Sequence, residues 1–134
     1  MVHVSVHQRT EPSHLAGIRP LEEELGRALR ARDWAAFDLA YDRLAVLQTA
    51  DALAHWQAAR AMAEGDYEEA RQLLEILLRD NPFDLRTGLN LALVHEAQGE
   101  IKKARNIARD LSRRHPLDSG LQSLLDRMEN TRAR

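Results

Sequence analysis

Two stretches of the chain, GDYEEARQLLEILLRDNP at residues 65–82 and GEIKKARNIARDLSRRHP at residues 99–116, share one layout of glycine, alanine and proline. Each stretch opens on glycine, has alanine five residues later and closes on proline, so every landmark recurs after 34 residues. A fixed period of about 34 residues is typical of helix-turn-helix repeats, in which each hairpin buries its apolar face by stacking on the next. The sequence therefore predicts an all-α array of stacked helical hairpins.

The charges on this shared layout differ between the two stretches. Residues 51–100 hold ten acidic residues against four arginines, whereas residues 101–134 hold nine basic residues against four acidic ones. Since the small and apolar positions are constrained by packing, the difference falls on solvent-facing positions. These positions then determine the electrostatic field at the protein surface. The formal net charge of −2 conceals this polarity.

Length and composition indicate one folded unit. With 134 residues, 44% of them hydrophobic, the chain is long enough for one core and too apolar for a disordered composition. It contains no cysteine, so disulfide and thiolate chemistry are excluded. The first residues lack the pattern of a secretory signal, and no apolar run approaches the about 20 residues of a membrane span. We therefore expect a cytoplasmic protein without a membrane partner.

The N-terminal residues 1–17 do not share the helical pattern and are predicted to form a flexible tail. Their three valines alternate with polar residues before a proline-containing stretch breaks the pattern. Pro20 suits the first position of a helix, and apolar residues follow it at helical spacing. Residues 18–134 are therefore predicted to form a single domain.

Six further helices are predicted from capping residues and from the helical spacing of apolar side chains. The second helix is expected at residues 34–48, and Pro82 and Pro116 end two later helices because proline cannot continue the hydrogen-bond ladder. The last helix, residues 119–131, has one apolar and one polar face, as the end of a repeat array requires. The residues predicted to cap helix N-termini are Asp33, Asp51, Asp66 (with Glu69 in a capping box), Asp84 and Asp118.

These landmarks resemble the tetratricopeptide repeat family. On the family pattern, Ala70 and Ala104 match the small residue of the second helix of a repeat, and Pro82 and Pro116 match its terminal proline. The resemblance implies a right-handed superhelix of stacked hairpins that ends in a C-terminal capping helix. Its three repeats fall at about residues 18–50, 51–84 and 85–118.

In this family, the first helices of successive repeats line a concave groove that receives partner peptides. The family's tryptophan position holds Ala54 here, and Trp56 follows two residues later, either lining the groove or filling the core of a rotated helix. Exposed tryptophan and methionine are common anchors for an apolar guest. The groove positions that the resemblance carries over are Ala52, His55, Trp56, Ala59, Met62, Arg86, Leu89, Asn90, Leu93 and Glu96.

The resemblance thus implies a non-enzymatic interaction module, an adaptor or chaperone that holds a helical or extended apolar segment of a partner protein. Small bacterial chaperones of type III secretion have a similar size and layout, so that role is an alternative. Another alternative is an assembly or self-association scaffold, and hence a homo-oligomer, that acts through its charged faces. The basic residues predicted to form an electrostatic docking patch are Lys102, Lys103, Arg105, Arg109 and Arg113.

Catalytic, cofactor and metal sites are not expected. The sequence shows no nucleophile with its base, no phosphate-binding loop and no ligand cluster, and the pair His3 and His7 lacks a third ligand. No aromatic residues interleave with the basic patch, so a nucleic-acid partner is not expected either. His95 takes an aromatic position of the family pattern and is predicted to be a core histidine that hydrogen-bonds a neighbour.

Overall fold

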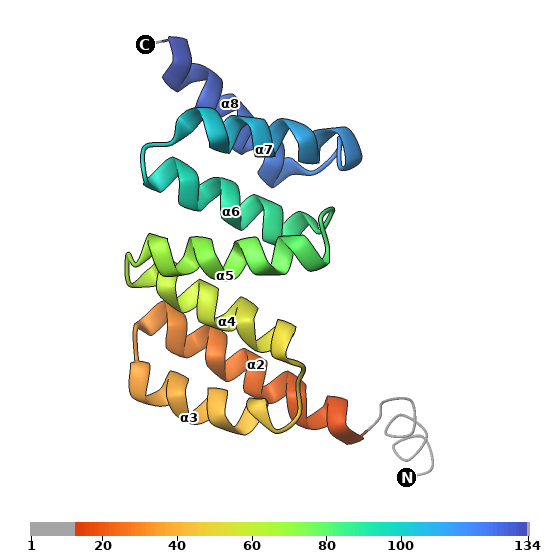
Figure 1. Cartoon of the computed structure of the whole chain (residues 1–134). Coiled ribbons are helices and arrows are strands. Elements are labelled where there is room, and N and C mark those ends of the chain that lie inside the picture. The colour runs from red at the N-terminus through yellow and green to blue at the C-terminus, as the bar shows by residue number, and fades with distance from the viewer. Residues whose placement is uncertain (1–12, 134) are drawn as a thin grey trace. The chain divides into compact units, whose positions relative to one another are not determined.

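The computed structural model describes the backbone of residues 13–133 and the side chains of residues 17–130 (Figure 1). All regular secondary structure in this part of the chain is helical, which confirms the predicted fold class. The predicted histidine pair and most of the predicted tail lie outside the described residues. The helices are α2 (Ser13–Ala31), α3 (Trp34–Ala45), α4 (Ala50–Ala63), α5 (Tyr67–Asp80), α6 (Leu85–Ala97), α7 (Ile101–Arg114) and α8 (Ser119–Ala133).

The chain divides into two compact units, and the boundary falls within α4, between Leu53 and Ala54. In the first unit α2 packs against α3, and Leu25, Phe37 and Leu44 are buried. In the second unit α6 packs against both α5 and α7, and α7 packs against α8. The single domain and the right-handed superhelix expected from the sequence stay predictions.

The first helix begins earlier than predicted. α2 starts at Ser13, so Pro20 lies inside the helix rather than at its first position, and the helix includes residues 13–17 of the predicted tail. Proline removes one hydrogen bond of the ladder, but the preceding turn still forms when tertiary packing supports it. That support comes from Ile18, which is buried. The second helix is shorter than predicted, because α3 ends at Ala45, three residues before the predicted limit at residue 48.

Four of the five predicted capping aspartates are confirmed. The exception is Asp51, which lies in the first turn of α4, while the Thr49 hydroxyl accepts the backbone N–H of Ala52 at 3.3 Å. Of the predicted capping box, the hydrogen bond from the Glu69 N–H to the Asp66 carboxylate forms. The reverse bond to the Glu69 side chain is replaced, because the N–H of Asp66 donates to the Ala61 carbonyl. The carboxylates of Asp33, Asp66, Asp84 and Asp118 each accept from the backbone N–H three residues later.

One left-handed residue closes the helix before each tight turn within a hairpin. Gly65 and Gly99 have φ angles of 78° and 82°. In both turns the following N–H bonds to the carbonyl five residues back, which is the Schellman arrangement. The corresponding residue of the first hairpin is Arg32, with a φ angle of 55°.

An Arg32→Gly variant should therefore be more stable than the native chain. An L-residue with a side chain is strained in the left-handed region, and the gain, net of glycine's larger unfolded-state entropy, is about 0.5–1 kcal/mol. Thermal unfolding followed by circular dichroism should show a higher Tm. The reverse change, Gly65→Arg, serves as the comparison and should lower Tm; an unchanged or lower Tm for Arg32→Gly would contradict the prediction.

The core of the second unit consists of two clusters that lie on different sides of α6, and the half-buried Ile107 packs against both. Together the clusters take buried residues of α5, α7 and α8 at helical spacing, in agreement with the spacing of apolar side chains from which these helices were predicted. The first cluster holds Ala58, Ala61, Ala70, Leu74, Leu77, Leu91 and Val94. The second holds Ala92, Ala104, Ala108, Leu111, Leu121, Leu124 and Met128.

Candidate functional site

The part of α4 that belongs to the second unit packs through small side chains. Ala54, Ala58 and Ala61 contribute to the first cluster, at the spacing of one helical face. Trp56 is half-buried and is part of neither cluster of this unit. The core of the second unit is therefore built without Trp56.

The predicted groove residues differ in how far they are engaged inside the second unit. Met62 packs partly against the first cluster, and Leu89 and Leu93 pack partly against the second. All three are half-buried, so part of each side chain stays accessible. Ala52 lies on the other side of the unit boundary. The remaining predicted positions are the half-buried His55, Ala59 and Asn90 and the exposed Arg86.

Glu96, another predicted groove residue, is held by a side chain of α8. Arg127 Nη2 lies 2.6 Å from Glu96 Oε1, and Arg127 Nε donates to Glu96 Oε2 at 3.0 Å. This two-point arrangement fixes both side chains and neutralises the carboxylate. A partner would therefore meet an ion pair at this position instead of a free negative charge.

The predicted basic docking patch is partly neutralised within the chain. Arg109 Nη2 lies 2.8 Å from Glu129 Oε1 of α8, and Arg105 Nε lies 3.9 Å from the same oxygen. Lys103 pairs with Glu100, and Arg113 pairs with Asp110. Of the five predicted bases only Lys102 has no ion pair or hydrogen bond among the described residues. The patch therefore presents less positive charge to a partner than its sequence indicates; its docking role stays a prediction.

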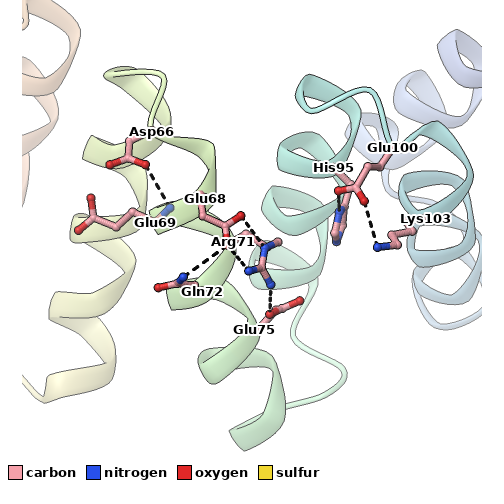
Figure 2. Close-up of polar contacts among 9 residues, drawn as sticks. All are labelled: Asp66, Glu68, Glu69, Arg71, Gln72, Glu75, His95, Glu100 and Lys103. Carbon is pink, nitrogen blue, oxygen red and sulfur yellow. Dashed lines mark hydrogen bonds and ion pairs between the residues drawn. The ribbon is translucent and has the colours of Figure 1, made fainter.

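On α5, Arg71 lies between two carboxylates and bonds to both Glu68 and Glu75 (Figure 2). Its guanidinium lowers the pKa of Glu68 to about 2, with a smaller contribution from the Gln72 amide. The acidic stretch seen in the sequence is thus partly compensated by its own arginine.

His95 connects α6 to the start of α7. The residue is 5% exposed, and its Nδ1 lies 3.1 Å from Glu100 Oε1, which confirms the prediction of a buried histidine bonded to a neighbour. The other oxygen of Glu100 pairs with Lys103 Nζ at 3.0 Å, and Lys103 and then His95 lower the pKa of Glu100 (Figure 2). Because this carboxylate is engaged, Glu100 makes no side-chain cap to α7.

Two neighbouring hollows lie away from the predicted groove positions, the first between α5, α6 and α7 and the second between α7 and the loop that joins α5 to α6. The first has a volume of about 880 Å³ and the second about 580 Å³, and Pro82 lines both. Neither hollow was predicted from the sequence, because both depend on which elements become neighbours in the fold. The first is lined by Glu75, Leu78, Arg79, Pro82, Leu91, His95, Lys103, Asn106 and Ile107. The second is lined by Pro82, Phe83, Asp110, Leu111, Arg113 and Arg114.

The described part of the chain contains no group of three or more His, Cys, Asp or Glu side chains placed to hold a metal ion. Among the described helices, none combines the length and the apolar character needed to cross a membrane.

A family model of the tetratricopeptide repeat matches residues 61–128, about half of the chain. Neither a curated protein nor a solved structure matches the chain at a significant level. The matched residues run from the end of α4 to α8 and contain both hollows.

Proposed function

The chain belongs to the tetratricopeptide repeat family, and from this premise we propose that it holds an apolar segment of a partner protein along α4 and α6. Members of this family generally act as non-enzymatic modules that bind other proteins. The proposal adds the site, the half-buried apolar residues Trp56, Met62, Leu89 and Leu93, and the class of guest, a helical or extended apolar segment.

The observation that carries the proposal is the placement of Trp56. A tryptophan is the largest apolar side chain, and burying it on binding contributes strongly to affinity. Here it is only half-buried and takes no part in the two clusters that hold the second unit together. Leu89 and Leu93 supply accessible apolar surface at i, i+4 spacing on α6, which suits a guest that presents side chains at similar intervals.

The same face serves an adaptor, a general chaperone or a secretion chaperone, and the identity of the guest decides between these roles. The alternative of a scaffold that assembles through charged faces receives less support, because Arg105 and Arg109 are already paired with Glu129.

A Leu93→Glu variant tests the proposal. A carboxylate on this face should weaken partner binding at least about tenfold, because the charge must lose its hydration when an apolar guest covers it. Partners captured by the native chain from its own lysate are identified by mass spectrometry, purified, and titrated against both proteins by calorimetry.

Leu125→Glu is the matched control, because Leu125 also packs partly against the second cluster but belongs to α8. Circular dichroism must show both variants still helical. Leu125→Glu should bind the purified partner as tightly as the native chain does. If Leu93→Glu also binds it as tightly, or if both variants lose the same affinity, the proposed face is wrong.

A further inference from the structure

The first hollow has the walls of a site for apolar side chains. Leu78 and Pro82 line it from the α5 side and Ile107 from α7, while Leu91 and His95 of α6 are its most deeply buried lining residues. Its volume of about 880 Å³ lies within the range of about 300–1,000 Å³ that is common for ligand sites. Figure 2 labels three of the lining residues, Glu75, His95 and Lys103, one from each helix.

The charged groups at this hollow are unequally compensated. Glu75 shares the guanidinium of Arg71 with Glu68, and Lys103 is paired with Glu100. Arg79, which also lines the hollow, forms no ion pair or hydrogen bond among the described residues. In the described part of the chain, Arg79 is therefore the charged side chain that stays unengaged beside the apolar walls, together with the amide of Asn106.

The second hollow repeats this combination of apolar surface and an uncompensated arginine. The Arg114 guanidinium lies 3.4 Å from the centre of the Phe83 ring, and it has no carboxylate partner in the described part of the chain. Stacking holds the guanidinium in place while its edge N–H groups stay free to donate. By contrast, the other described arginines of α5, α7 and α8 all pair with carboxylates, namely Arg71, Arg105, Arg109, Arg113 and Arg127.

His95 adds a hydrogen-bond acceptor to the first hollow. Its Nδ1 faces the ionised Glu100 and carries the proton of that contact. In the neutral ring the other nitrogen, Nε2, is then an acceptor. Since His95 lines the hollow, this nitrogen suits a backbone N–H of a bound chain.

We propose that the two hollows, joined at Pro82, form an outer trough that binds a protein segment in which apolar side chains are flanked by acidic residues. The apolar side chains enter between Leu78 and Ile107 and beside Phe83, and the carboxylates reach Arg79 and Arg114. This site goes beyond the proposed function, because none of its lining residues belongs to the face of Trp56 and Leu93. The chain would thus hold two guest segments on separate surfaces.

The test uses a fluorescein-labelled peptide of alternating glutamate and leucine, titrated by fluorescence anisotropy against the full chain. Binding should exceed that of a lysine–leucine peptide and of a glutamate–serine peptide. Arg79→Gln should weaken binding about tenfold, the usual loss for one charge-assisted hydrogen bond. Asn106→Asp, which hardly changes the shape of the wall, should weaken it as well by repelling the carboxylates of the peptide.

Lys102→Gln is the matched control. It removes the same charge from an exposed position of α7 that does not line either hollow. Equal losses for Lys102→Gln and Arg79→Gln would show diffuse charge attraction and overturn the proposal, as would equal binding of the three peptides by the native chain.

Two further measurements separate this site from its alternatives. The Leu93→Glu variant should bind the glutamate–leucine peptide as tightly as the native chain, so a failure of the proposed function leaves the trough testable. In sedimentation experiments the native chain alone should show no self-association that depends on Arg79, so the native chain and Arg79→Gln should sediment alike. If such association is found, the trough holds a second copy of the chain, and the proposed guest is wrong.

Discussion

A Leu74→Ala variant should lose about 3 kcal/mol of unfolding free energy, which lies within the range of about 2–5 kcal/mol for truncating a buried leucine to alanine. Leu74 is completely buried at the centre of the first cluster, where residues of α4, α5 and α6 meet. Its removal leaves a cavity in addition to the lost transfer energy, because packed helices collapse only partly around a void. Urea unfolding at equilibrium measures the loss.

Ile76→Ala is the matched control, two residues away on the same helix. Ile76 is 50% exposed, so its truncation should change stability by less than about 1 kcal/mol. Similar losses for the two variants would contradict the assignment of the buried and exposed faces of α5.

The faces of the later helices were predictable because they depend on local periodicity. The 3.6-residue spacing of Ala70, Leu74 and Leu77 determines which side of α5 is apolar, whatever that side contacts. The turns at Gly65 and Gly99 were similarly marked, since only glycine adopts the left-handed conformation without strain.

Two of the local predictions failed because tertiary packing and competing side chains outweigh residue preferences. Pro20 marks a helix start only when nothing stabilises the preceding turn, and here Ile18 is buried in that turn. Asp51 is a good capping residue, but Thr49 lies two residues earlier and its hydroxyl takes the first-turn N–H.

The candidate sites were less predictable than the helices, because they depend on contacts between residues distant in sequence. Glu96 meets Arg127, and Arg109 meets Glu129, only after α8 has packed at the end of the array. These pairs neutralise Glu96 and Arg109, two charged side chains that the sequence analysis predicted to contact a partner protein. The hollow beside Arg79 likewise exists only once α5 and α7 lie on either side of α6.

The close approach of α6 and α7 makes Gly88 the glycine of the second unit whose added Cβ would have the closest neighbours. A Cβ atom built at this buried position would lie 2.7 Å from Leu111 Cδ1, 2.9 Å from its Cδ2 and 3.1 Å from its Cγ. Since these three atoms belong to one side chain, Leu111 must move, and because Leu111 is buried in the second cluster, its movement disturbs the packing there. Overpacking of this kind costs about 1–3 kcal/mol, more than the about 1 kcal/mol that alanine gains over glycine inside a helix.

We therefore expect Gly88→Ala to lower stability by up to about 2 kcal/mol and Tm by up to about 10 °C. Gly26→Ala is the control, because the nearest atom to its added Cβ, at 3.3 Å, is the flexible tip of Arg30. This control should keep or raise Tm through the better helix propensity of alanine. Because Leu111 also lines the second hollow, Gly88→Ala should weaken binding of the glutamate–leucine peptide at temperatures where the variant stays folded. A Tm at or above the native value would show that Leu111 moves aside without cost, and the tight packing inferred at Gly88 would be wrong.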